Sequence, residues 1–345
     1  MAKLFFLLSG EHDTLPISEL KSIVEAGGYR YKVVEILDQA LRIEADSECI
    51  DTIEKKSAFT KMCGLEVLNC EADVNEIVSS VRVANFEKVL RDGESFVVRL
   101  RRVKEYSQAI NGMALENRIG NLLLNKVNKT KVNLRNPDKT FVGILTSGKF
   151  LFGLKIAEIS PKPFMERRPK RKPFFHPSAM HAKLSRCMVN LTKPKNGELV
   201  FDPFCGTGST LIEALLIGCE ALGMDIQRRM ARGTRRNLEY FDLKSGDVIV
   251  GDSRRLPIKK VDCVVTDPPY GRSATTLKRT TKQIIEEVLE AVSDVLHKGN
   301  RICMAAPKTL AIGSIGESRG YKHLESHFVY VHRSLTREIA VFEKR

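Results

Sequence analysis

Residues 199–218 read LVFDPFCGTGSTLIEALLIG. An apolar run ends at Asp202, and the pair Gly206 and Gly208 then leads into apolar residues at helical spacing. Glycines at such a turn let the backbone bend tightly and approach a ligand with no side chain between them. The order of strand, glycine turn and helix predicts the first βα unit of a doubly wound sheet, in which ligands bind at the carboxyl ends of the strands.

Short apolar runs and helical patterns continue to alternate after this stretch, which predicts an α/β fold with a mostly parallel sheet covered by helices on both faces. A final pair of strands predicts an antiparallel terminal hairpin. The expected strands are 199–204, 221–226, 248–250, 261–266, 302–306, 327–333 and 336–343, and the expected helices are 209–217, 228–241 and 282–296.

Acidic residues stand at the ends of successive strands. Asp225 is placed to accept hydrogen bonds from ribose hydroxyls, and Asp252 from an adenine amine. One such Asp is commonly a helix cap or a turn residue, so it is the recurrence that indicates a nucleoside ligand. A dinucleotide fingerprint would need Gly or Ala where Leu211 stands, which argues against a nicotinamide dinucleotide.

The fourth strand ends in Asp267-Pro268-Pro269-Tyr270. Two prolines also make an ordinary rigid turn. An amine conjugated to a base is a poor nucleophile, however, and Asp267 with the Pro268 carbonyl would accept both of its protons and orient its lone pair toward a methyl donor. Tyr270 would stack on the base.

The first half of the chain predicts a smaller α+β region. Its expected strands are 3–8, 31–36, 40–43, 96–103, 131–134, 141–145 and 150–156, and its expected helices are 18–26 and 106–128. Residues 160–173, SPKPFMERRPKRKP, contain four prolines and no apolar periodicity, so we expect a linker without regular structure.

Positive charge is concentrated in the middle of the chain. The net charge is +14, and residues 96–172 carry 18 Lys or Arg against 5 Asp or Glu, whereas residues 1–95 carry 11 against 18. Solvation alone does not require positive and negative residues to lie in separate segments. Binding to the phosphate backbone of a nucleic acid would explain the basic segment. The predicted RNA-binding residues are Arg99, Arg101, Arg102, Lys104, Lys131, Arg135, Arg167, Arg168, Lys170, Arg171 and Lys172.

Other classes of protein fit the sequence poorly. No apolar run reaches the roughly 18 residues that span a bilayer, which predicts a cytoplasmic protein without membrane partners. The eight cysteines form no CxxC pair and the histidines no ligand motif, so we expect no metal. A cysteine nucleophile is not expected either, because Cys205 lies on the glycine turn and no thiol adjoins Pro268.

The ordered motifs at residues 202–208, Asp225, Asp252 and 267–270 resemble class I S-adenosylmethionine-dependent methyltransferases that methylate exocyclic amines, over residues 174–345. The stretches 96–103, 115–120, 131–138 and 153–155 resemble THUMP-containing RNA-modifying enzymes. Together with Phe175-His176-Pro177, the chain is most similar to archaeal tRNA guanosine dimethyltransferases acting at position ten; relatives acting at position six usually have Asn where Asp267 stands.

This resemblance implies an N-terminal ferredoxin-like region (1–60), a THUMP RNA-binding domain (61–157), a basic linker (158–173) and a Rossmann-like methyltransferase domain (174–345). It implies S-adenosylmethionine as methyl donor, tRNA as partner, and mono- and dimethylguanosine as products. The implied catalytic residues are Asp267, Pro268, Pro269 and Tyr270. The implied cofactor-binding residues are Asp202, Cys205, Gly206, Thr207, Gly208, Asp225, Ile226, Asp252, Ser253 and Asp267.

Several alternatives stay open at this point. They are methylation of guanosine 6 or of another RNA amine, a DNA amine methyltransferase, and a non-catalytic RNA-binding protein. We expect a monomer, with an accessory subunit left open. His176 and His181 are candidates for the substrate entrance, although a capping or packing role is the commoner one for a histidine.

Overall fold

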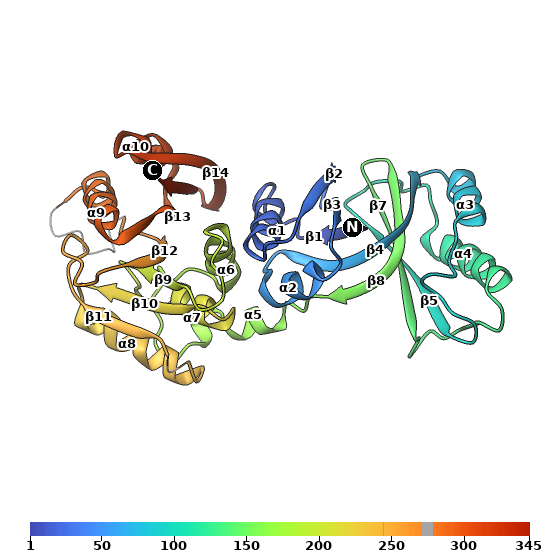
Figure 1. The fold of residues 1–345 in the computed structure, drawn as a ribbon, viewed down its shortest axis with the longest axis horizontal. Coiled ribbons are helices and arrows are strands. Elements are labelled where there is room, and N and C mark those ends of the chain that lie inside the picture. The colour runs from blue at the N-terminus through green and yellow to red at the C-terminus, as the bar shows by residue number, and fades with distance from the viewer. Residues whose placement is uncertain (244, 271–278) are drawn as a thin grey trace. The chain divides into compact units, whose positions relative to one another are not determined.

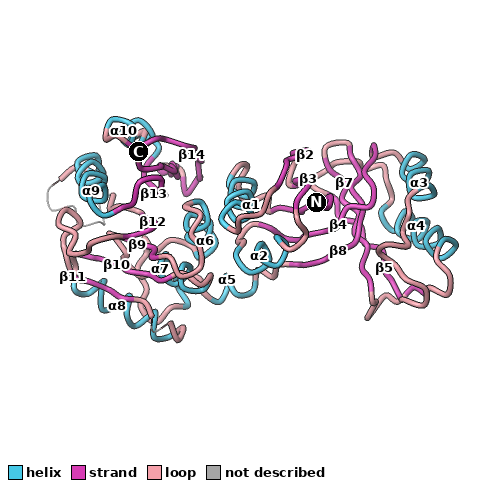
Figure 2. The backbone as a smooth tube through the Cα atoms, viewed as in Figure 1, coloured by secondary structure: helices cyan, strands magenta, loops and turns pink. Residues whose placement is uncertain are grey.

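The computed structural model describes residues 1–243, 245–270 and 279–345 (Figures 1 and 2). Gly271, which follows the predicted catalytic motif, lies outside them. The chain forms two compact units, the first from Met1–Asp13, Gly28–Glu54 and Thr60–Ser160, the second from Thr14–Gly27, Lys55–Phe59 and Pro161–Arg345. Helix α1 (Leu15–Ala26), expected in an N-terminal α+β region, therefore belongs to the second unit.

An eight-stranded sheet forms the first unit, in the order β2-β3-β1-β4-β8-β7-β5-β6. The strands are β1 (Ala2–Leu8), β2 (Tyr31–Leu37), β3 (Ala40–Ala45), β4 (Thr60–Glu71), β5 (Ser95–Arg102), β6 (Lys131–Val132), β7 (Lys139–Thr146) and β8 (Lys149–Glu158). Strand β5 pairs in parallel with β6 and β7, and the other pairs are antiparallel.

Helices α3 (Val74–Val83) and α4 (Gly112–Lys126) pack on this sheet, while α2 (Cys49–Lys56) follows β3. Between helices and sheet lies an aromatic core in which Phe141 stacks on Phe152 with ring centroids 5.8 Å apart. The helix expected over 106–128 begins only at Gly112, because the Asn111 side chain accepts the Ala114 N–H at 3.0 Å and caps the first turn.

The second unit contains a seven-stranded sheet in the order β11-β10-β9-β12-β13-β15-β14. Its strands are β9 (Leu199–Asp202), β10 (Glu220–Asp225), β11 (Asp247–Val250), β12 (Val261–Thr266), β13 (Leu296–Pro307), β14 (Tyr321–His332) and β15 (Leu335–Lys344). The pairs from β11 to β13 are parallel, and β15 is antiparallel to both β13 and β14. This confirms the predicted doubly wound sheet with a terminal antiparallel hairpin.

Helices cover both faces of this sheet, as Figure 1 shows. One apolar core includes residues of α6 (Ala182–Leu191), α7 (Ser209–Leu216) and α8 (Arg228–Tyr240). The other includes residues of α9 (Thr281–Val295) and α10 (Ile312–Ser318). A short 3-10 helix, η2 (Lys308–Leu310), precedes α10.

The Pro-rich segment differs from its prediction, because it holds helix α5 (Lys162–Glu166) and the 3-10 helix η1 (Pro169–Arg171). Prolines in the first turn of α5 remove no hydrogen bond that the helix needs. Phe164 is buried, with the Arg167 and Arg186 guanidinium carbons 4.9 and 5.5 Å from its ring centroid. Tertiary contacts therefore give this segment a fixed course that its composition did not predict.

Candidate active site

A pocket of about 240 Å³ lies in the second unit at the carboxyl ends of β9, β10, β11 and β12. This is the edge where a doubly wound sheet binds its ligands. Predicted cofactor and catalytic residues line it: Asp202, Cys205, Gly206, Thr207, Asp225, Ile226, Asp252, Ser253, Asp267, Pro268, Pro269 and Tyr270. The pocket thus gathers four separate strand ends that the sequence analysis singled out.

The glycine turn between β9 and α7 needs both of its glycines. Gly206 and Gly208 have φ of +54° and +78°, a region that other residues rarely adopt. A Cβ on Gly208 would also lie 2.7 Å from the Thr234 Cγ2 atom. The Thr234 hydroxyl donates to the Gly206 carbonyl at 2.7 Å, which ties the turn to α8.

Asp202 and Cys205 are buried beneath the surface of this turn. Asp202 is 3% exposed and accepts hydrogen bonds from the Phe204 N–H (3.0 Å) and the Thr266 hydroxyl (2.8 Å). Burial raises the pKa of Asp202 to about 7. Burial also raises the pKa of the Cys205 thiol well above its usual value, which disfavours the reactive thiolate. Both residues shape the turn and have little surface left for a ligand.

Asp225, at the end of β10, faces the same turn. Its carboxylate accepts the Gly206 N–H at 3.2 Å and the Gln227 N–H at 2.8 Å. Burial raises its pKa, and these two hydrogen bonds oppose the rise. A carboxylate has about four acceptor positions, so two remain for a ligand's hydroxyls. Beside it, the exposed apolar side chain of Ile226 lines the pocket.

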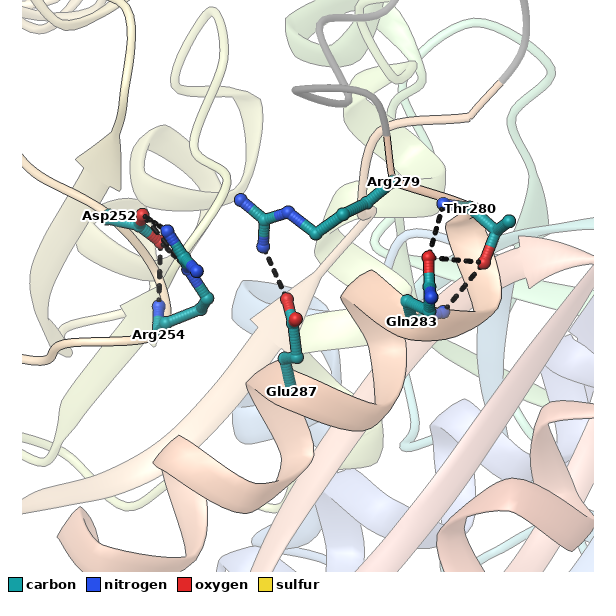
Figure 3. Close-up of polar contacts among 6 residues, drawn as sticks. All are labelled: Asp252, Arg254, Arg279, Thr280, Gln283 and Glu287. Carbon is teal, nitrogen blue, oxygen red and sulfur yellow. Dashed lines mark hydrogen bonds and ion pairs between the residues drawn. The ribbon is translucent and has the colours of Figure 1, made fainter.

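Asp252 differs from Asp225, because its carboxylate already pairs with the Arg254 side chain (Figure 3). Arg254 donates from Nη2 to Asp252 Oδ2 at 2.6 Å and from Nε to both carboxylate oxygens at 3.1 Å. This pairing lowers the pKa of Asp252. Across the pocket, Arg279 pairs with Glu287 of α9, which begins with a capping box between Thr280 and Gln283 (Figure 3).

Asp267 and Tyr270 follow β12 and contact Arg337 of β15. The Arg337 Nη2 lies 3.4 Å from Asp267 Oδ2, and its Nε donates to the Tyr270 hydroxyl. Burial raises the pKa of Asp267, while Arg337 and the Tyr270 hydroxyl lower it. The other oxygen, Asp267 Oδ1, is buried with no hydrogen-bond partner among the described residues. A buried acceptor in a pocket is expected to receive its donor from a ligand.

Sequence reasoning missed Arg337, which also lines the pocket. It lies in the terminal hairpin, 67 residues beyond Tyr270, and no local motif marks it. Of the two candidate histidines, His176 lines the pocket, with its Nδ1 2.7 Å from the Ser178 hydroxyl. His181 directly precedes α6, and the described lining residues do not include it.

Two of the predicted RNA-binding residues are engaged inside the second unit. Lys172 is 5% exposed, and its Nζ donates to the Ser209 hydroxyl at 2.6 Å. Burial lowers the pKa of Lys172 to about 8. Arg167 donates to the buried Glu213 at 2.7 Å. Contrary to the prediction, the Lys172 side chain does not reach the surface, whereas Arg168, Lys170 and Arg171 do.

The other predicted RNA-binding residues lie in the first unit, on and beside β5. Arg101, Arg102, Lys104, Lys131 and Arg135 are exposed, and Arg99 is half-buried. Lys131 begins β6, which pairs in parallel with β5. Lys104 lies 2.7 Å from Asp38, and Arg99 lies 3.8 Å from Glu116. Exposed pairs of this kind are weak, so they leave these side chains available to phosphates.

Two kinds of feature are absent from the part of the chain that the structure describes. No cluster of three or more His, Cys, Asp or Glu side chains there is arranged to bind a metal ion. No helix in residues 1–243, 245–270 and 279–345 is both long and apolar enough to span a membrane.

The fold and the sequence matches together identify a class I S-adenosylmethionine-dependent methyltransferase. Residues 169–338 match the RMKL-like methyltransferase domain, and residues 71–152 match the THUMP domain. The chain belongs to the tRNA (guanine(10)-N2)-dimethyltransferase family. It is 36% identical to the protein of that name from Methanothermobacter thermautotrophicus (99% of each chain) and 32% identical to that from Methanocaldococcus jannaschii (98% of this chain, 99% of the relative).

Solved structures share the fold at lower sequence identity. TrmN from Thermus thermophilus matches with a TM-score of 0.54 and 17% identity, over 99% of this chain and 100% of that chain. SMU.472, whose structure was solved in complex with SAH, matches with a TM-score of 0.55 and 14% identity, over 100% of this chain and 98% of that chain. These matches agree with the predicted fold class.

Proposed function

We propose that the protein transfers methyl groups from S-adenosylmethionine to the exocyclic amine of guanosine 10 in tRNA. The observation that carries the proposal is the buried Asp267 Oδ1, which lines the pocket beside Pro268 and has no partner among the described residues. Two relatives of nearly the same length are named for this reaction. Guanosine 6 is disfavoured as the alternative target, because these relatives, 32–36% identical over nearly the full chain, are named for position ten.

The cofactor side of the pocket is formed by the ends of β9, β10 and β11. Asp225 has two acceptor positions left for the ribose hydroxyls, and Ile226 offers an apolar surface for the adenine. We assign the turn of Gly206, Thr207 and Gly208 to the methionine end of the cofactor, and Asp252 and Ser253 to the adenine end. All of these residues except Gly208 line the pocket. When bound there, S-adenosylmethionine supplies an electrophilic methyl group. We propose no metal for this step.

The target base enters on the other side, beside Asp267 and Tyr270. Asp267 Oδ1 and the Pro268 carbonyl accept the two amine protons and orient the nitrogen lone pair toward the methyl group. A nitrogen–carbon bond forms as the sulfur–carbon bond breaks, and the amine proton then passes to Asp267 or to water. Tyr270, whose hydroxyl is held by Arg337, stacks on the base.

We assign tRNA contacts outside the pocket to the exposed basic residues beside β5 and to Arg168, Lys170 and Arg171. A paired guanosine must leave its stack to reach Asp267, which costs a few kcal/mol, and stacking on Tyr270 returns a similar amount. We further propose that the protein works as a monomer in the cytoplasm. An accessory subunit is the alternative if the chain binds cofactor and tRNA but does not turn over.

The test is methylation of an unmodified tRNA transcript with labelled S-adenosylmethionine, followed by nucleoside analysis. We expect N2-methylguanosine and then N2,N2-dimethylguanosine, and no label when guanosine 10 alone is replaced by adenosine. A transcript with guanosine 6 replaced is the matched control and should be labelled normally. Label that persists without guanosine 10, or label in duplex DNA instead of tRNA, would contradict the proposal.

A further inference from the structure

Strand β14 carries two aromatic rings on its solvent-facing side. Phe328 is 54% exposed and Tyr330 is 71% exposed, while Val329 between them is buried. Alternate residues of a strand point to the same face, so the two rings lie next to each other on one face of β14. Burying such rings against a partner would remove a large apolar surface from water.

These rings lie at the edge of the sheet that holds the pocket. Because β13 is parallel to β12 and β15 is antiparallel to β13, the start of β15 and the end of β14 share the carboxyl edge of β12. Val329 pairs in register with Arg337, whose guanidinium lies 3.4 Å from Asp267. The two rings therefore lie on either side of Val329, the strand partner of Arg337, near this carboxyl edge. Their side chains point to the sheet face opposite to that of the Arg337 side chain.

The surroundings of the rings are basic. Lys308 Nζ lies 4.8 Å from the Phe328 ring centroid, and Arg333 is exposed at the turn after β14. Residues 301–316 and 326–337 contain no Asp or Glu. The carboxylate opposite Phe328, Glu338, is buried and accepts the Ile312 N–H at 2.9 Å, so it does not offset this charge at the surface.

We propose that Lys308, Phe328, Tyr330 and Arg333, here called the β14 platform, bind tRNA nucleotides that flank the target guanosine. Sites that bind single-stranded nucleic acid combine aromatic rings with Lys or Arg, because bases stack on the rings and phosphates pair with the cations. A guanosine drawn into the pocket leaves unstacked neighbours close by. The basic charge beside the rings favours RNA over an apolar protein partner. The inference rests on the proposed function and adds a further RNA contact, next to the pocket, to those proposed above.

The test compares Tyr330→Ala and Phe328→Ala with wild type, using one tRNA transcript and measuring its Kd, its KM and the KM for S-adenosylmethionine. We expect the Kd and KM for tRNA to rise by roughly 5- to 150-fold for each ring removed. The KM for S-adenosylmethionine and the melting temperature should stay unchanged. Tyr330→Phe should restore tRNA binding, because it keeps the ring, and Lys308→Glu should weaken binding most at low salt.

Tyr240→Ala is the matched control. Tyr240 is 61% exposed but ends α8, which runs back from the carboxyl end of β10 toward the opposite edge of the sheet. The Tyr240→Ala substitution should leave tRNA affinity unchanged. If wild type methylates tRNA and both alanine variants keep its affinity and KM, the β14 platform is wrong and the proposed function stands. If wild type does not methylate tRNA, the proposed function fails, and unchanged tRNA binding by Tyr330→Ala would overturn the platform as well.

Discussion

The two sides of the pocket are built in different ways. On the cofactor side, two backbone donors join neighbouring βα units: the Cys205 N–H donates to the Met224 carbonyl at 2.9 Å, and the Gly206 N–H donates to Asp225. On the base side, Asp267 and Tyr270 are held by Arg337 from the last strand. The first side is a local consequence of its motifs, whereas the second depends on a contact that only the completed sheet creates.

The largest effect among substitutions that sharpen this contrast is expected for Tyr270→Ala. Loss of base stacking should lower kcat on intact tRNA by between about 5- and 150-fold. Cofactor affinity should not change, because Tyr270 lies beyond β12 and not on the cofactor turn. Single-turnover rates together with S-adenosylhomocysteine titration separate the two effects. Equal losses of rate and of cofactor affinity would show that the two sides are not independent.

Arg337→Ala tests the long-range contact through pH. Burial raises the pKa of Asp267 and Arg337 lowers it, so removing Arg337 should raise that pKa further. Asp267 must be ionised to accept the amine protons, so activity is lost as pH falls through its pKa. The acid limb of kcat should therefore move to higher pH, and activity at a fixed pH on that limb should fall about tenfold for each pH unit that the limb moves. Arg337→Lys, which keeps the charge, should move the limb less; an unmoved limb in Arg337→Ala would contradict this role.

Asp225→Asn breaks the cofactor side alone. Loss of a charged acceptor for the ribose hydroxyls should raise the KM for S-adenosylmethionine about tenfold, while kcat at saturating cofactor stays near wild type. Initial rates over a range of cofactor concentrations measure both parameters. A fall in kcat with an unchanged KM for S-adenosylmethionine would instead indicate that Asp225 acts on the base side of the pocket.

Asp252→Asn should have the smallest effect, because Arg254 already engages both carboxylate oxygens of Asp252. Loss of the exposed Asp252–Arg254 ion pair should change the free energy of cofactor binding by about 1 kcal/mol or less. Cofactor affinity should therefore change no more than about fivefold. Titration with S-adenosylhomocysteine measures it. A larger loss of cofactor affinity than in Asp225→Asn would mean that adenine displaces Arg254 and that Asp252 contributes more to cofactor binding than Asp225 does.

Local patterns predicted most of the second unit, because a strand, a glycine turn and a helix follow one another within a few residues there. They did not predict β4, which lies between β1 and β8 and mixes polar with apolar residues. Nor did composition distinguish Lys172, buried against Ser209, from Lys170 two residues earlier on the surface.

Long-range contacts explain the remaining differences. The second unit includes α1, whose buried Glu19 accepts hydrogen bonds from the Ala58 and Phe59 N–H groups and from Asn190. These partners are 39 to 171 residues away in sequence. No periodicity near residue 19 indicates them, just as none near residue 337 indicates its contact with Asp267.

The central claim is that Asp267 acts on the target amine. The resemblance also implies a cofactor contact for Asp267, and the same experiment measures that contact. The direct test is Asp267→Ala, with S-adenosylhomocysteine binding measured by calorimetry and methyl transfer to tRNA measured in a single turnover at saturating cofactor. We predict binding close to wild type and transfer slowed by about a hundredfold or more. Wild-type transfer, or a loss of cofactor affinity that accounts for the whole defect, would contradict the claim.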